Sequence, residues 1–218
     1  MNSMNNKKRI LLSFIMAVFL LITFPAFAVA MQYGVAAGNY SSGENAYGTY
    51  GYNYVQSNIP TITSGHVSSI YVLDPPITNH REVGWVKLVD WENPKFFAAW
   101  TDNGIYGQQL FNDASPNSNH SYKVQNILGT KDWQFYVDGT LKLSKTNFTQ
   151  TWTHGISVCS SERNDLGDTN YSHFWSLKYM NSNGTLYSWT DLRPGTDNDP
   201  EYYLEKYSDT ECYMVKES

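Results

Sequence analysis

Short runs of alternating apolar and polar residues, separated by turn residues, constrain the fold of this chain most strongly. Such runs cover residues 67–73, 82–88, 95–100, 121–125, 133–137 and 141–143. Period-2 alternation is typical of half-buried β-strands, and the pairs Asn103-Gly104 and Asp138-Gly139 favour tight hairpin turns. No helical periodicity of useful length follows residue 30. The sequence therefore predicts an all-β fold, an antiparallel β-sandwich or jelly roll of about nine or ten strands.

Composition supports strands over helices. Aromatic residues make up 16% of the chain, including 17 Tyr and 7 Trp, whereas charged residues make up only 16%. Aromatic residues favour strands, and the charged residues that favour helices are scarce. Three further strands are expected at 152–159, 173–180 and 186–189. The Gly-, Ser-, Asn- and Tyr-rich stretch 31–60 is expected to be an irregular or edge segment, and the tail 194–218 to be turn-rich.

The first thirty residues have the order of a secretory signal. Lys7, Lys8 and Arg9 precede an apolar run over 10–24, and small residues follow at Ala26, Ala28 and Ala30. This order of basic, apolar and small-residue regions is typical of a cleavable signal peptide, and the run is shorter than a membrane span. The sequence predicts a signal peptide over 1–30, a single β-sandwich domain over 31–218, and a secreted, extracellular protein.

Charge and missing motifs exclude several classes of function. Removing the three basic residues of the signal from the 15 in the chain leaves 12 against 20 acidic residues, a net charge of −8. An acidic chain without basic clusters repels phosphate backbones, so no nucleic-acid partner is expected, and no membrane association after cleavage. The chain lacks the common hydrolase, metalloprotease and phosphate-binding motifs. Its five His show no metal-ligand spacing, so neither a metal nor a cofactor is predicted.

Two cysteines, Cys159 and Cys212, lie in the exported part of the chain. In an oxidising compartment the simplest expectation is one disulfide that ties the tail to an inner strand. Two free thiols are the alternative.

The segment around Glu82 is the most informative for function. Alternation places Val83 and Trp85 on one face of the expected strand and Glu82 on the other, with Gly84 beside it. A glycine contributes no side chain, so the carboxyl is expected to face open space of the kind that a ligand groove needs. The alternative is a surface glutamate paired with Arg81 or Lys87.

Three segments, in order, resemble the catalytic domain of neprosin-type glutamic peptidases. They are Ser69–Val72, then Glu82-Val83-Gly84-Trp85, then the aromatic run Phe96–Gly104; Lys131–Phe135 is similar to a later aromatic strand of that family. The resemblance implies a concanavalin-A-like β-sandwich in which Glu82 is catalytic. It also implies a second catalytic glutamate, for which Glu162 is the best match, and aromatic side chains such as Trp133 and Tyr71 that hold substrate.

Paired glutamates imply hydrolysis of a peptide bond by acid and base. One carboxyl, kept protonated, would polarise the scissile carbonyl, and the other would activate a water, with activity in acid. On strict alternation, Glu162 shares the face of Ile156 and Val158.

A carbohydrate-binding or adhesive sandwich without catalysis is the alternative function, because exposed aromatic rings can stack on sugars. The candidates lie in two tyrosine clusters, at Tyr47, Tyr50, Tyr52 and Tyr54, and at Tyr202, Tyr203 and Tyr207. Trp85, Trp100, Trp133 and Trp175 also fit simple core positions, and an interaction protein without a small-molecule site stays open. The expected partner is an extracellular peptide or polysaccharide.

Overall fold

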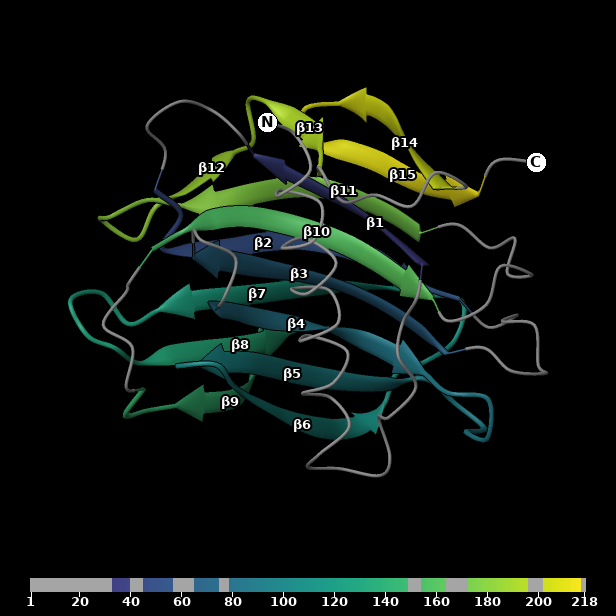
Figure 1. Cartoon of the computed structure of the whole chain (residues 1–218), viewed down its shortest axis with the longest axis horizontal. Helices are drawn as coiled ribbons and strands as arrows, with labels where there is room; N and C mark the ends of the chain where they lie inside the picture. Colours follow the sequence, from purple (N-terminus) through teal and green to yellow (C-terminus); the bar gives the residue numbers. More distant parts are fainter. Residues whose placement is uncertain are drawn as a thin grey trace, which may run out of the picture.

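A computed structural model describes residues 33–39, 45–56, 65–74, 79–148, 154–163, 172–195 and 202–216. These residues form fifteen strands and no helix, in two antiparallel sheets that pack face to face (Figure 1). The predicted all-β antiparallel sandwich is confirmed. No helix among the described residues is long and apolar enough to cross a membrane. The predicted signal peptide, 1–30, lies outside the described residues.

One sheet has seven strands in the order β13-β1-β10-β3-β4-β5-β6. Their bounds are β1 Tyr33–Asn39, β3 His66–Asp74, β4 Asn79–Lys87, β5 Lys95–Asp102, β6 Ile105–Asp113, β10 Ile156–Arg163 and β13 Leu192–Pro194. β3, β4 and β5 follow one another both in the sequence and in the sheet. β10, which pairs with β3, comes from a distant part of the chain, so segments far apart in sequence meet in this sheet.

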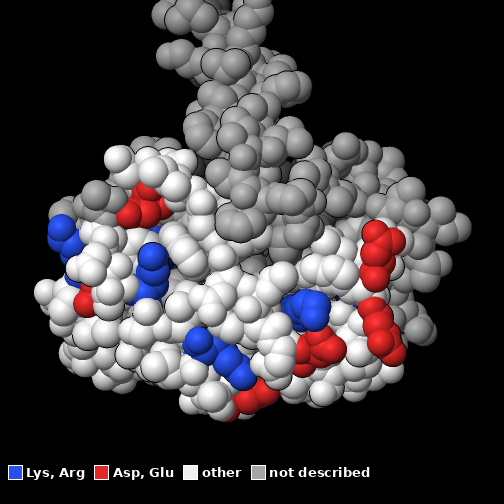
Figure 2. Space-filling view, turned by 90° about the horizontal axis from the view of Figure 1, so that it is seen from below, with Lys and Arg blue, Asp and Glu red and all other residues white. Residues whose placement is uncertain are grey.

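The other sheet has eight strands, seven of them in the order β14-β15-β11-β2-β7-β8-β9, with β12 paired to β11. Their bounds are β2 Gly48–Val55, β7 Ser118–Asn126, β8 Trp133–Val137, β9 Thr140–Lys145, β11 Ser172–Met180, β12 Leu186–Ser188, β14 Tyr202–Ser208 and β15 Glu211–Lys216. Viewed from the side of β6 and β9, Lys, Arg, Asp and Glu side chains are interspersed among uncharged residues (Figure 2).

The two predicted hairpin turns are confirmed. Asn103 and Gly104 join β5 to β6 with φ of 52° and 76°, and Asp138 and Gly139 join β8 to β9 with φ of 49° and 70°. Two successive residues with positive φ are the mark of the type I′ turn, whose twist matches that of the paired strands. Because these residue types tolerate positive φ, they determine where the chain reverses direction in the two hairpins.

The expectation of an irregular segment at 31–60 is wrong for its described part. β2 is an inner strand of the eight-stranded sheet, paired with both β11 and β7. Its inward residues, such as Thr49 and Asn53, are small or polar, so the alternation with outward tyrosines is not an apolar–polar one. The tail expected to be turn-rich likewise forms the β14-β15 hairpin. Strand pairing, rather than apolar periodicity, orders both segments.

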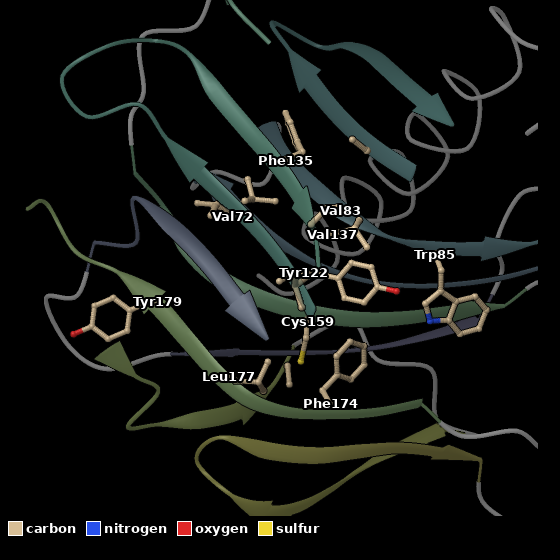
Figure 3. Packing of buried hydrophobic residues seen from close by; sticks show 14 of the residues in the cluster. Val72, Val83, Trp85, Tyr122, Phe135, Val137, Cys159, Phe174, Leu177 and Tyr179 are labelled. Carbon is tan, nitrogen blue, oxygen red and sulfur yellow. The ribbon is translucent and has the colours of Figure 1, made fainter. Parts of the chain in front are cut away.

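The core lies between the sheets. Val83 and Trp85 are fully buried in it, with Phe135, Phe174 and Leu177 of the other sheet in the same cluster (Figure 3). The Trp85 indole N–H donates to Asn53 Oδ1 at 2.5 Å, and this buried bond joins the two sheets. A buried tryptophan needs such a partner for its N–H. The prediction that Val83 and Trp85 face the core is therefore confirmed, and Glu82 faces outward.

Cys159 on β10 and Cys212 on β15 meet in the core. Both are fully buried, and their sulfur atoms lie 4.0 Å apart without a bond between them. Burial, with Cys212 nearby, raises the pKa of the Cys159 thiol. The disulfide stays a prediction, now between two side chains that already face each other from opposite sheets.

Candidate active site

The strand register places Glu82 and Glu162 on one face of the seven-stranded sheet. Glu82 on β4 lies opposite Tyr71 on β3, and Tyr71 lies opposite Val158 on β10. Directly opposed residues share a face, and every second residue along a strand does too. Glu162, four residues after Val158, therefore shares the outer face of Glu82. The alternation that groups Glu162 with Ile156 and Val158 is what brings the two glutamates together.

The two glutamates lie diagonally across the sheet. Glu162 opposes Val67, which opposes Val86, four residues beyond Glu82. Two strand spacings and four residues correspond to roughly 16 Å between the Cα atoms on a flat sheet. The row of residues between them is small: Ala36, Ser160, Ser69 and Gly84. The residue midway along the diagonal is therefore Ser69, which has a small side chain.

The Glu82 carboxyl has a polar neighbour at each oxygen. Ser69 Oγ donates to Oε1 at 2.5 Å, and His80 Nε2 lies 3.5 Å from Oε2. The side chain is only 14% exposed. Burial, and then the negative charge of Glu162, raise the pKa of Glu82 to about 8, against the opposing effect of the Ser69 hydrogen bond. Burial disfavours the charged form of a carboxyl, so Glu82 is an acid that keeps its proton at neutral pH.

Glu162 is the more accessible of the pair. Its residue surface is exposed, although enough protein surrounds the carboxyl for desolvation to raise its pKa above the ordinary value. Desolvation favours the protonated carboxyl of Glu162, whereas exposure favours the ionised one. The exposure is the larger effect, because water that reaches the carboxyl solvates its charge. Glu162 therefore ionises at lower pH than Glu82, and its charge then helps Glu82 to hold a proton.

Two tyrosines complete the cluster. Tyr71 on β3 and Tyr106 on β6 both have a pKa raised first by burial and then by the charges of Glu82 and Glu162. The hydroxyl of Tyr71 also hydrogen-bonds Ser160. Both phenols stay protonated at any working pH, and the Tyr106 O–H donates to Gln108 Oε1 at 3.0 Å. Tyr71 lies directly opposite Glu82 on the neighbouring strand, and the Tyr106 ring lies 6.1 Å from that of His80, so the two tyrosines flank the Glu82 end of the site.

The space beside Glu82 is not open as expected from Gly84. A Cβ at position 84 would overlap the carbonyl oxygen of Ser68 and lie 2.7 Å from the Cβ of Ser69. The glycine is needed because β3 and β4 approach closely, and this approach brings the Ser69 hydroxyl to Glu82. The prediction of open space is corrected: the absent side chain makes room for the neighbouring strand.

Replacing Gly84 with Ala should destabilise the fold by about 1–3 kcal/mol, because the clash is with backbone that cannot turn away. Urea unfolding of the mature chain would measure the loss. Gly51→Ala is the matched control, since its nearest neighbour is the tip of the flexible Leu177 side chain at 2.8 Å, and it should cost less. Equal losses at both positions would contradict the close-approach explanation.

Trp133, predicted to hold substrate, lies elsewhere. It is fully buried between the sheets on β8, within the main core cluster. Its predicted contact with substrate is corrected to a packing role, because alternation on β8 turns Trp133, Phe135 and Val137 inward together. Tyr71 does lie beside Glu82.

Sequence reasoning missed His80, Ser69, Ser160 and Tyr106. His80 is two residues before Glu82, so period-2 alternation alone could have placed it on the same face. The other three depend on strand pairing that the sequence does not specify. Among the described residues, no three His, Cys, Asp or Glu side chains are grouped to hold a metal ion.

No family model and no curated protein matches this chain. Solved structures do. Scytalido-glutamic peptidase, solved with a transition state analog inhibitor, has a TM-score of 0.63 at 12% identity, over 85% of this chain and 98% of that one. SCP-B, a member of the eqolisin family of peptidases solved with the tripeptide Ala-Ile-His, has a TM-score of 0.58 at 11% identity, over 84% and 96%. At these identities the likeness shows the fold, and a neprosin-type assignment is not confirmed.

Proposed function

We propose that this protein is a glutamic endopeptidase in which Glu162 is the base and Glu82 the acid. The observation that carries the proposal is that two carboxyls share one sheet face but lie in different surroundings, so that the pKa of Glu82 is higher than that of Glu162. Such a separation is what assigns the two roles in acid–base pairs. The shared fold with two glutamic peptidases supports it.

Hydrolysis would follow from these two protonation states. Ionised Glu162 takes a proton from a water, whose oxygen attacks the scissile carbonyl carbon, while the Glu82 O–H donates to the carbonyl oxygen. Glu162 then passes its proton to the amide nitrogen, and the C–N bond breaks to release the amine. As the carbonyl re-forms, one of the two hydroxyl groups of the tetrahedral intermediate returns its proton to Glu82, which leaves the carboxylic acid product. Tyr71 can donate a hydrogen bond to the developing negative oxygen, whereas the Tyr106 O–H already donates to Gln108 Oε1.

Partly buried apolar side chains on the outer face of the sheet, Val67, Trp91 and Leu110, would suit an extended peptide with apolar side chains. A second hydrophobic cluster lies on the outer face of the same sheet, where Val86, Phe97 and Ala99 are buried under partly buried neighbours. Ala99 lies directly opposite Glu82, so this cluster adjoins the acid. The predicted signal peptide supports an extracellular peptide substrate and a mature domain over 31–218.

Incubation of the purified mature chain with an unfolded protein tests the proposal. New peptide termini should form and be identified by mass spectrometry in assays that span about pH 4 to 8, with the alkaline limit set by the Glu82 pKa of about 8. A chain that is folded and yet inert across this range would overturn the peptidase function.

A carbohydrate-binding function is the second candidate, favoured by a continuous aromatic ladder on the outer face of the other sheet. Ring–ring contacts with centroids 4.1–5.7 Å apart link its members, which are Tyr207, Tyr213, His173, Trp175, Tyr52 and Tyr50. Aromatic rings with polar edges are suited to sugars. Cross-strand stacking also stabilises a sheet, so binding has to be measured directly.

Trp175→Ala should abolish any glycan binding, because Trp175 links the rings of β11 to those of β2. A glycan array would identify the ligand, and calorimetry would compare the variants. Tyr187→Ala, which removes an exposed ring on β12 outside the ladder, is the control and should bind normally. An array without signal for the wild-type chain would remove this candidate.

A further inference from the structure

His80 lies against the acid of the candidate pair. It precedes Glu82 by two residues on β4, so both side chains occupy the outer face, with His80 Nε2 3.5 Å from Glu82 Oε2. The other ring nitrogen, Nδ1, lies 3.0 Å from Thr101 Oγ1 on β5. If the Thr101 hydroxyl donates to Nδ1, the ring proton lies on Nε2 and points to Glu82. Thr101 can thus set the tautomer that serves the carboxyl.

The imidazole is fixed by rings from two other strands. Tyr71 of β3 lies edge-on to it with centroids 6.4 Å apart, and Tyr106 of β6 lies tilted at 6.1 Å. The His80 side chain is only 17% exposed. The same two tyrosines lie near Glu82, so His80 belongs to the same cluster. Because rings pack against it from two strands, the imidazole has little freedom to turn.

A buried cation lies behind the sheet. Arg81 points into the core, where its guanidinium lies 3.7 Å from the centroid of the Phe148 ring. It donates to the backbone oxygen of His80 at 2.8 Å and to that of Thr101. Burial, and then the charge of Arg81, lower the pKa of His80 to about 4. Among the described residues, Glu82, Tyr71 and Tyr106 are the further ionisable groups that lie against His80 or its ring.

A neutral histidine matters for the acid. A histidine of ordinary pKa beside a carboxyl would form an ion pair, His⁺ with Glu⁻, and Glu82 would then lack the proton that its role requires. Arg81 opposes this outcome, because a second positive charge behind the strand disfavours the imidazolium. The neutral ring can direct its one N–H toward Glu82 Oε2, 3.5 Å away, while the Ser69 hydroxyl donates to Oε1.

We propose that His80, held by Thr101 and packed between the rings of Tyr71 and Tyr106, is a positioning residue that orients the protonated Glu82 carboxyl toward the scissile carbonyl. This inference rests on the proposed function, but its structural part can be tested without any activity.

Imidazole NMR of ¹⁵N-histidine-labelled mature chain tests the state of the ring. His80 should titrate near pH 4 and show the Nε2–H tautomer at neutral pH. Arg81→Gln should raise the His80 midpoint, provided that the variant folds. Titration near the ordinary value of about 6.5 in the wild-type chain, or the Nδ1–H tautomer, would overturn the proposal.

Carboxyl NMR and kinetics test the effect on Glu82. A neutral donor favours the ionised carboxyl, so His80→Phe should raise the Glu82 midpoint above that of the wild type. It should also lower kcat by about tenfold or more with KM little changed, because orientation is lost rather than binding. His80→Gln, which retains a side-chain N–H, should recover part of the rate. Thr101→Val should raise the Glu82 midpoint and lower kcat, as His80→Phe does.

His120→Gln is the matched control. It removes a histidine that lies 2.6 Å from a carboxyl, Asp138, in the other sheet, and it should leave both the Glu82 midpoint and kcat unchanged. An inert wild-type chain in which His80→Phe still raises the Glu82 midpoint would refute the peptidase function and leave only the interaction of His80 with Glu82 supported. An unchanged midpoint in His80→Phe would overturn the positioning role.

Discussion

Glu162→Gln should lower kcat/KM for an unfolded protein substrate by a factor between about 10² and 10⁴, the usual contribution of a general base. A glutamine at this position cannot take a proton from water, whereas its size and polarity are those of glutamate. Because Glu162 is exposed, the substitution should leave the free energy of unfolding nearly unchanged. Initial rates and urea unfolding of the same preparation separate the two effects.

The matched control is Glu205→Gln, an exposed glutamate on β14 of the other sheet, which should keep full activity. Glu82 gives a complementary comparison. Glu82→Leu removes the donor and should be inactive, whereas Glu82→Gln keeps an N–H that can polarise a carbonyl and should retain part of the rate. Full activity in Glu162→Gln would show that another group is the base.

Local alternation was enough to predict the face of Glu82. Val83 and Trp85 are apolar neighbours in a strand, so the sandwich had to bury them and turn Glu82 outward. The meeting of Glu82 with Glu162 could not be predicted in the same way. It depends on β10 pairing with β3, a contact between segments about ninety residues apart in sequence, and on the register of that pairing.

The failures have related physical causes. β2 was missed because its inward positions include Asn53, whose polarity is tolerated inside only through hydrogen bonds to Trp85 and Ser68. Trp133 was given a binding role because an aromatic residue in a strand suits either a ligand or the core, and only the packing of the two sheets decides. The role of Gly84 depends on how closely two strands approach, which composition does not reveal.

The wild-type chain should lose stability between about pH 5 and 8 in a way that Glu82→Gln does not. The folded-state pKa of Glu82, about 8, lies above its unfolded value near 4.3. A group with a raised folded pKa contributes stability that is complete below the unfolded pKa and is lost as pH rises through the folded one. The loss could reach about 4 kcal/mol, because burying an ionised carboxylate is unfavourable.

The same ionisation should set the alkaline limit of activity. Wild-type kcat/KM should fall near pH 8 as Glu82 loses its proton, while the acid limit reflects the raised pKa of Glu162. The optimum should therefore lie nearer to neutral pH than the acid range expected from a carboxyl pair alone. In Glu82→Gln the alkaline limit should disappear, because the amide does not titrate.

Urea unfolding at half-unit steps from pH 4 to 9, on wild type, Glu82→Gln and the exposed control Glu92→Gln, measures the stability difference. The control should follow the wild type throughout, since an exposed carboxyl has little desolvation to lose. Wild type and Glu82→Gln should agree near pH 4 and diverge steadily above about pH 5, with the glutamine variant the more stable. Parallel curves up to pH 9 would mean that Glu82 ionises without resistance, in which case the carboxyl cannot hold the proton that catalysis requires of it.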